Sequence, residues 1–235
     1  MLAVYKREFR SYFVTAMGYV FLTIFMIVLG LTFVFNNIAN NSADMQSYYS
    51  AISPIYLIVF TVILTMRLMT EEKRSRTEVL LLTSPVSAGG IVMGKFFAAL
   101  SVYAIGVVST ILYALFVLAF TSIDLSVVIG GMLGLLLYGA LFLSIGIFIS
   151  SLTDSQVSAA IATFCALFFL YLAENFISLI PNSTLTDLLY WLSFYSKYTQ
   201  ISQGVLSLSH LVYFLSLTSL FCFLTIRVVE KKRWA

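Results

Sequence analysis

The stretch from Gly89 to Phe96 comes nearest in this sequence to a nucleotide-binding motif. It reads GGIVMGKF, and it matches a phosphate-binding loop at every position but the last. That position must be Ser or Thr to bind magnesium, and here it is Phe96. A phosphate-binding loop also follows a strand, whereas no strand is expected before this stretch and the helix after it is expected to enter the membrane. We therefore interpret the glycines as the entry of the chain into a membrane span.

A second candidate is the acidic pair Glu71 and Glu72, which begins the sequence EEKRSR. The pattern EExxxR is typical of intramembrane CAAX-type proteases, so an intramembrane hydrolase is one alternative for the function. That chemistry also needs histidine within hydrogen-bond reach of the acids. The single histidine of the sequence, His210, is expected near the opposite membrane surface. The sequence therefore favours a charged connection between two spans over a hydrolytic site.

The composition is typical of a multi-pass α-helical membrane protein. Of the 235 residues, 61% are hydrophobic and 10% are charged, and the mean hydropathy is +1.02. Soluble domains contain about 25% charged residues. A chain of this length has room for about six spans of roughly 20 residues each and for no soluble catalytic domain. Cys165 and Cys222 lie in apolar runs, so we expect small buried side chains there, not a disulfide or a metal site.

The apolar runs predict an all-α fold with a single transmembrane domain over residues 1–235. The predicted spans are residues 17–35, 52–66, 91–120, 127–150, 157–179 and 208–228. Lys95, at the inner end of the third span, is expected to extend its ammonium group to the membrane surface. The polar connections predict that Lys197 alone, of the 13 Lys and Arg residues, lies on the outer side.

This charge asymmetry predicts the orientation, because positive residues collect on the cytoplasmic side of a membrane. Both termini and the connection 67–95 are expected to be cytoplasmic. The expected location is a bacterial cell membrane, that is, an inner or plasma membrane.

Two segments outside the spans are expected to form helices at the membrane surface. Residues 2–13 have helical amphipathic spacing, which predicts an interfacial helix. Its predicted polar face consists of Arg7, Glu8, Arg10 and Ser11. Residues 181–207 are rich in aromatic side chains, among them Tyr198, which predicts one or two short re-entrant or interfacial helices on the outer side.

Gly130 and Gly134 have the GxxxG spacing that allows two helices to approach closely in a membrane. Packing within the chain is favoured over a dimer face, and both alternatives stay open at this point.

The connection between the second and third spans carries a resemblance to a known family. From Thr70 it reads TEEKRSRTEVLLLTSPVSAGGIVMGKFFAAL, which resembles the cytoplasmic loop of ABC-2-type exporter permeases. The sequence is most similar to the branch with gliding-motility-associated permease subunits. The similarity extends over most of the chain, including SQGVLSLSHLVYFLS before the last span. In that family the loop carries a coupling helix that docks on a separate ATPase subunit.

The resemblance assigns the ATPase-docking role to charged and apolar residues of this loop. They are Glu71, Glu72, Arg74, Arg76, Glu78, Leu80, Leu81 and Pro85. The residues independently favour an interface, because an apolar centre with a charged rim is typical of protein contacts. An amphipathic segment lying on lipid is the alternative.

The resemblance implies a permease subunit of an ATP-driven exporter that is not itself an enzyme. No cofactor is expected in this chain, since ATP and magnesium would be bound by the partner ATPase. A second permease subunit, identical or related, would complete the pore within the lipid bilayer, and no nucleic acid partner is expected. A non-transporting membrane scaffold is a further alternative, beside the intramembrane hydrolase.

Glu174 and Asn175 interrupt the apolar pattern of the fifth span. A charge at the centre of a span costs about 2.5–3.5 kcal/mol on insertion scales. One interpretation is that both residues line a substrate path, with Tyr195 and Lys197 closing its outer exit. The other is a structural carboxyl group that ends the helix, and the sequence does not separate the two.

Overall fold

The computed structural model describes residues 1–74, 86–176, 193–205 and 207–234, with only the backbone at residues 74, 174–176 and 234. Within these ranges the regular secondary structure is entirely helical. Six helical segments are long and apolar enough to cross a membrane. The prediction of an all-α, multi-pass membrane protein with six spans is therefore confirmed.

Three of the six spans each combine two helical segments. The first combines α2 (Met17–Phe33) with the π-helical η1 (Val34–Ile38), the second α4 (Pro54–Thr65) with α5 (Thr70–Arg74), and the third α7 (Ala88–Val108) with α8 (Thr110–Leu118). The other three are α9 (Leu125–Leu152), α10 (Gln156–Phe176) and α13 (Leu208–Trp234). Shorter helices are α1 (Leu2–Val14), α3 (Met45–Ala51) and α12 (Phe194–Ser202). Each predicted span overlaps one of these segments, and residues 177–179 lie outside the described ranges.

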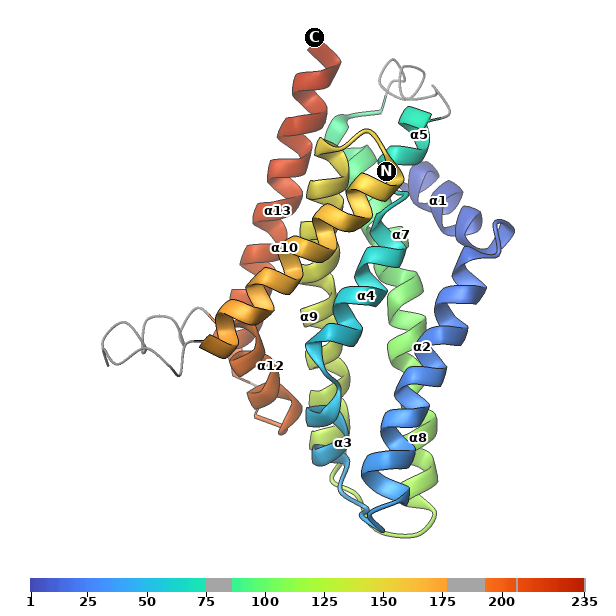
Figure 1. Cartoon of the computed structure of the whole chain (residues 1–235), viewed down its shortest axis with the longest axis vertical. Helices are drawn as coiled ribbons and strands as arrows, with labels where there is room; N and C mark the ends of the chain where they lie inside the picture. The colour runs from blue at the N-terminus through green and yellow to red at the C-terminus, as the bar shows by residue number, and fades with distance from the viewer. Residues whose placement is uncertain (75–85, 177–192, 206, 235) are drawn as a thin grey trace, which may run out of the picture.

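The bundle has two ends of different composition (Figure 1). The chain termini, α1, α5 and the last turns of α13 lie at one end, here called the basic end. Its Lys and Arg residues include Lys6, Arg7, Arg10, Arg67, Lys73, Arg227, Lys231, Lys232 and Arg233. The opposite end, here called the distal end, contains η1, α3 and the connection from α8 to α9.

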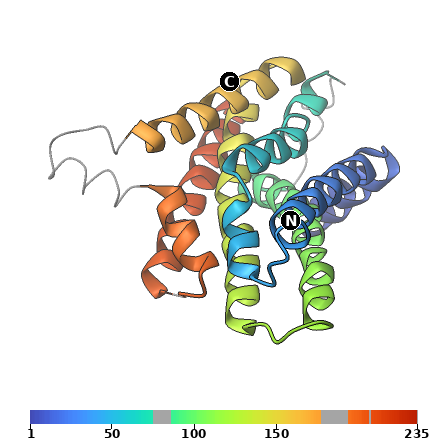
Figure 2. The ribbon, with the colours of Figure 1, turned by 60° about the horizontal axis from the view of Figure 1, so that its bottom comes forward.

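Helix α9 is the central helix of the bundle and packs against α4, α7, α10, α12 and α13 (Figures 1 and 2). Its face towards α12 carries the GxxxG glycines. A Cβ atom on Gly130 would lie 2.5 Å from the carbonyl oxygen of Ile201, and one on Gly134 would lie 3.3 Å from the Ile201 side chain. The predicted use of this motif for packing within the chain is therefore confirmed.

Buried tyrosines hold α3 and α12 in the distal half of the bundle. Tyr49 of α3 and Tyr198 of α12 are both fully buried. The Tyr198 hydroxyl donates to the Tyr49 carbonyl oxygen at 2.8 Å, and the Tyr49 hydroxyl lies 3.3 Å from the Thr110 hydroxyl. Burial raises the pKa of the Tyr198 hydroxyl, which favours the neutral form that can donate. Tyr198 of the predicted interfacial segment is therefore part of the core, and the position of α12 at the membrane surface stays a prediction.

Helix α10 lies at the outside of the bundle and packs on α4 and α9. Ile161 and Phe169 are exposed on it, and so is Cys165. The prediction of two buried cysteines is therefore right for Cys222 and wrong for Cys165; both are free thiols. Side chains exposed on a membrane span need not be polar, since they face lipid or another subunit.

The substitution Gly139→Ala tests the close packing of α7 on α9. A Cβ atom on Gly139 would overlap the buried ring of Tyr103, whose hydroxyl donates to the Leu135 carbonyl at 3.0 Å. Overpacking of this kind costs about 1–3 kcal/mol, so we expect a lower Tm of the detergent-solubilised protein. Gly89→Ala is the matched control, because its nearest contact would be 3.7 Å away. An unchanged Tm for Gly139→Ala would contradict this packing.

Candidate functional site

Lys95 is a buried cation two turns into α7. It is 1% exposed, its Nζ atom lies 3.0 Å from Oε1 of Glu72, and it donates to the Leu68 carbonyl at 2.5 Å. A buried ammonium group without such partners is strongly unfavourable. The sequence-based expectation that Lys95 extends to the membrane surface is wrong, because acceptors from other helices reach it inside the protein.

Glu8 brings a second carboxylate to Lys95, from α1. Its Oε1 atom lies 3.5 Å from Lys95 Nζ and accepts from Arg7 Nη2 at 2.6 Å. The same Arg7 nitrogen donates to Glu72 at 2.5 Å. Glu8 was predicted on the polar face of α1, yet it shares the inward face of the buried Tyr12, four residues on. Arg7, Glu8, Glu72 and Lys95, here called the ion cluster, therefore join α1, α5 and α7.

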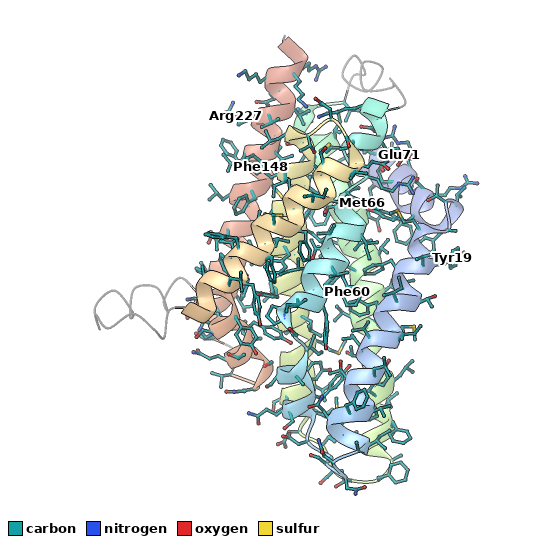
Figure 3. All side chains as sticks on the ribbon, viewed as in Figure 1. Tyr19, Phe60, Met66, Glu71, Phe148 and Arg227 are labelled. Carbon is teal, nitrogen blue, oxygen red and sulfur yellow. The ribbon has the colours of Figure 1, made fainter. Side chains whose placement is uncertain are left out.

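A second ion pair holds the turn between α4 and α5. The Arg67 guanidinium donates to both oxygens of Glu71, at 2.5 and 2.9 Å, and to the Thr15 hydroxyl at 3.0 Å. Bidentate pairs of this kind are geometrically specific. Arg67 thus connects α5 to the turn between α1 and α2, at the end of the bundle where Figure 3 labels Glu71. A cavity of about 200 Å³ is lined by Arg7, Glu8, Ser11, Arg67, Leu68, Glu71, Glu72 and Lys95.

Two lysines bind the carbonyl groups at the C-terminal end of α9, which have no partner within the helix. Lys73 of α5 donates to the carbonyls of Ser151, at 3.3 Å, and Thr153, and pairs with Asp154 at 3.0 Å. Lys232 of α13 donates to the Ser151 carbonyl at 2.7 Å. The hydrogen bond from Lys73 lowers the pKa of the exposed Asp154 carboxyl. Cations are also favoured here by the helix dipole, so α5, α9 and α13 meet at one junction.

Both flanks of the connection 75–85 are anchored to the bundle, although the connection itself lies outside the described residues. On one side, Glu72 and Lys73 hold α5. On the other, the Val86 carbonyl accepts from Arg233 of α13 at 3.2 Å. The residues on both sides of this connection are therefore bound to α1, α7, α9 and α13.

The structure describes only part of the predicted docking site. Glu71 pairs with Arg67, and Glu72 belongs to the ion cluster. Arg74 ends α5, with only its backbone described. The remaining predicted residues lie outside the described ranges; they are Arg76, Glu78, Leu80, Leu81 and Pro85. Their docking role stays a prediction.

The residues predicted for a substrate path lie on α10 and α12. The helical backbone of α10 continues through Glu174 and Asn175 to Phe176, so the interrupted apolar pattern does not break the helix there. Lys197 is 8% exposed, and its Nζ atom lies 4.4 Å from the centre of the Tyr213 ring. The ring of Tyr195 lies 6.2 Å from that of Tyr198. Lys197 therefore packs against α13, and a role at an exit stays a prediction.

Several residues of this site were not assigned to it from the sequence: Arg7, Glu8, Arg67, Lys73, Lys95, Asp154 and Lys232. One available signal was the position of Lys95 beyond the entry of an apolar span, because a charge within a span generally requires a partner. The identity of that partner depends on contacts 23 and 87 positions away.

The sequence of the chain matches a known protein family. The family model described as "ABC-2 family transporter protein" matches residues 2–229, which is nearly the whole chain. The chain belongs to the ABC-2 transporter family. A search of curated proteins found no significant match.

Membership of this family identifies the chain as a membrane permease subunit of an ABC transporter, a multi-pass transport protein. It also implies work with an ABC ATPase, since the ABC-2 permease is the membrane subunit of the transporter and not its catalytic one.

Replacing Lys95 by Met tests whether the ion cluster holds the ABC-2 permease together. The change keeps most of the apolar stem and leaves Glu8 and Glu72 facing each other without the buried ammonium group. Removing one partner of a buried pair costs about 3–5 kcal/mol, so we expect a large decrease in Tm. Lys6→Met, at an exposed position of α1, is the control and should have no effect.

The triple variant Lys95→Met, Glu8→Gln, Glu72→Gln also removes the two carboxylate charges, which Arg7 alone would otherwise have to balance. It should recover part of the lost stability. A Lys95→Met protein as stable as the unmodified protein would show that the cluster does not hold these helices together.

Proposed function

We propose that this ABC-2 permease is part of an ATP-driven exporter and that residues 75–85 dock on its ATPase subunit. The observation that carries the proposal is the anchoring of both flanks of this connection, by the ion cluster and Lys73 before it and by Arg233 after it. A segment that only rested on lipid would not need to be tied to several helices. ATP and magnesium would be bound by the ATPase subunit.

The anchored flanks suggest how movement of the ATPase subunits reaches the membrane. Closure of two ATPase subunits around ATP would push on the connection and displace α5. Because Glu72 is paired with Lys95 and Arg7, α7 and α1 would move with α5. Lys73 would carry the connection between α9 and α10 in the same direction. Such rigid-body movement changes the gap between two subunits without unfolding either of them.

The proposed orientation places the basic end in the cytoplasm, together with both termini. It follows from the charge distribution, since cytoplasmic connections of membrane proteins are enriched in Lys and Arg. Labelling of a cysteine introduced at Ser75 by an impermeant reagent added from outside would contradict this orientation.

The complete transporter would contain a second permease subunit, identical or related. We also propose that the chain belongs to the branch of gliding-motility-associated permeases in a bacterial cell membrane. The support for this branch is the sequence TEEKRSRTEVLLLTSPVS from Thr70 onwards.

An intramembrane hydrolase is less well supported by the geometry. His210 lies in the first turn of α13, and the helix runs from there to the basic end, where α5 carries Glu71 and Glu72 (Figure 1). A catalytic base must come within hydrogen-bond reach of its partners. Both acids are moreover engaged with Arg67 and Lys95. A non-transporting scaffold is separated from the exporter by the docking experiment that follows.

Leu81→Asp should abolish the association with the ATPase. The substitution places a charge in the proposed apolar centre of the contact, where a buried unpaired charge costs several kcal/mol. We expect normal membrane insertion and normal Tm, with the ATPase subunit no longer co-purifying.

The control is Leu2→Asp, a substitution of the same kind at an exposed position of the basic end. It should leave co-purification unchanged. If the Leu81→Asp protein retains the ATPase as well as the control does, the connection is not the docking site. If no ATPase associates with the unmodified chain, that result favours the non-transporting scaffold over the exporter.

We further propose that Glu174 and Asn175 line the substrate path, with Tyr195 and Lys197 near its outer exit. Glu174→Gln keeps the shape and a hydrogen-bonding group but removes the ionisable carboxyl. We expect unchanged folding and ATPase association, with a change in transport or in substrate-stimulated ATP hydrolysis. Glu174→Leu is the companion variant, which destabilises the protein if the carboxyl has only a structural role. Normal transport by Glu174→Gln at equal expression would eliminate the path assignment.

A further inference from the structure

Helix α1 has one face turned towards the bundle and one turned away from it. On the inner face, Val4 and Tyr12 are buried, and α1 packs on α7. The other face, here called the outward face, is at least partly exposed; it consists of Leu2, Lys6, Phe9, Arg10 and Phe13. Lys6 and Arg10 are four residues apart, so they lie about one helical turn apart on the same side of α1. The outward face therefore presents two neighbouring cations.

The charge of the outward face is not balanced within the described part of the chain. Lys6 and Arg10 form no ion pair with any described residue. Glu8 is the one acidic residue of α1, and its carboxylate is bound to Lys95 and Arg7 in the ion cluster. Lys6 and Arg10 thus give this face two uncompensated positive charges, which favour an anionic partner.

Aromatic side chains connect the outward face to the wall of the first span. The ring centres of Phe9 and Phe13 lie 5.2 Å apart, and those of Phe13 and Tyr19 lie 5.4 Å apart. Tyr19 and Val20, in the first turns of α2, are 58% and 53% exposed, and Figure 3 shows Tyr19 at the outside of the bundle. Exposed aromatic side chains at the end of a span are typical of the boundary between acyl chains and head groups. The two cations therefore border an apolar surface that begins where the first span enters the membrane.

We propose that the outward face of α1 binds an acidic phospholipid in the leaflet at the basic end. The phosphate group would lie against Lys6 and Arg10, and an acyl chain would follow Phe13 and Tyr19 into the membrane. A lipid supplies an anion and an apolar chain in one molecule, which an acidic protein surface alone does not. This contact does not require the exporter function, and it forms on whichever side of the membrane the basic end lies.

The two charges make the binding selective among head groups. The head group of phosphatidylglycerol carries a net negative charge, whereas that of phosphatidylcholine is zwitterionic and has no net charge. Both lipids can place the same acyl chain along Phe13 and Tyr19. Each Lys or Arg near an anionic lipid surface increases binding about fivefold, so we expect phosphatidylglycerol to be preferred by at least that factor. Added salt should weaken the preference, because exposed charges are screened.

A tryptophan placed on the outward face measures this preference locally, since bromine atoms on acyl chains quench tryptophan fluorescence on contact. The full-length Phe13→Trp protein is reconstituted into vesicles of phosphatidylglycerol and phosphatidylcholine, with one lipid or the other brominated. The signal of the native Trp191 and Trp234 is subtracted with the protein that lacks the reporter. We expect stronger quenching by brominated phosphatidylglycerol at equal mole fraction. Leu2→Trp, at a position 67% exposed, is a second reporter if Phe13→Trp lowers the Tm.

Two double variants of the reporter protein test the role of the cations. Lys6→Gln with Arg10→Gln should remove the preference for phosphatidylglycerol. Arg227→Gln with Lys231→Gln is the matched control, because it removes the same positive charge from exposed side chains of α13. It should retain the preference in full.

Four results would overturn the proposal. Equal quenching by the two brominated lipids in the reporter protein would show that the outward face does not select an anion. An unchanged preference after Lys6→Gln with Arg10→Gln would show that these cations do not hold the head group. Loss of the preference in the α13 control as well would assign it to the overall charge of the protein. Absence of quenching by either lipid would mean that a protein surface covers α1.

Discussion

A single buried ammonium group constrains the whole basic end of this permease. Lys95 lies inside the third span, where it is stable only if acceptors surround it. Glu72 can reach it only if α5 turns back over α7, and Glu8 only if α1 lies across the same helix. The N-terminal helix and α5, which precedes the connection 75–85, are thus positioned by one electrostatic requirement. This requirement joins α1, α5 and α7 to one another.

The architecture of the chain could be predicted well from its sequence, because the physics of spanning a bilayer is local. Twenty apolar residues in a row must form a helix in lipid, since no other partner satisfies the backbone. The irregularities within the spans were harder to predict from the sequence. The third span is divided at Ser109, and the first ends in a π-helical turn. Neither feature changes the hydropathy pattern of the sequence. GxxxG packing was predictable because small residues at that spacing serve one purpose, helix approach.

The contacts of the candidate site could not be predicted in the same way, because they depend on which helices become neighbours. Considered alone, α1 has Glu8 on its polar face, and only the approach of α7 turns that face inward. The sequence around Lys95 is typical of a lysine whose side chain reaches the membrane surface. In the structure, two carboxylates from distant segments of the chain lie beside its ammonium group instead. Tyr198 likewise lies in a segment whose composition is typical of interfacial helices, yet its hydroxyl donates to a carbonyl oxygen of α3. A polar group in apolar surroundings indicates from the sequence that a partner is needed. Which group becomes that partner depends on the packing of the helices.

The lysine contacts at the end of α9 have a consequence for the order of biosynthesis. The partners of Lys95 precede it in the chain, so its charge can be neutralised as soon as the third span emerges from the ribosome and inserts. Lys73 must instead wait for Ser151 and Asp154, and the Ser151 carbonyl receives its second donor only from Lys232. The permease therefore closes its basic end last, once the sixth span has entered the membrane. Until then, the surface that faces the ATPase in our proposal is incomplete.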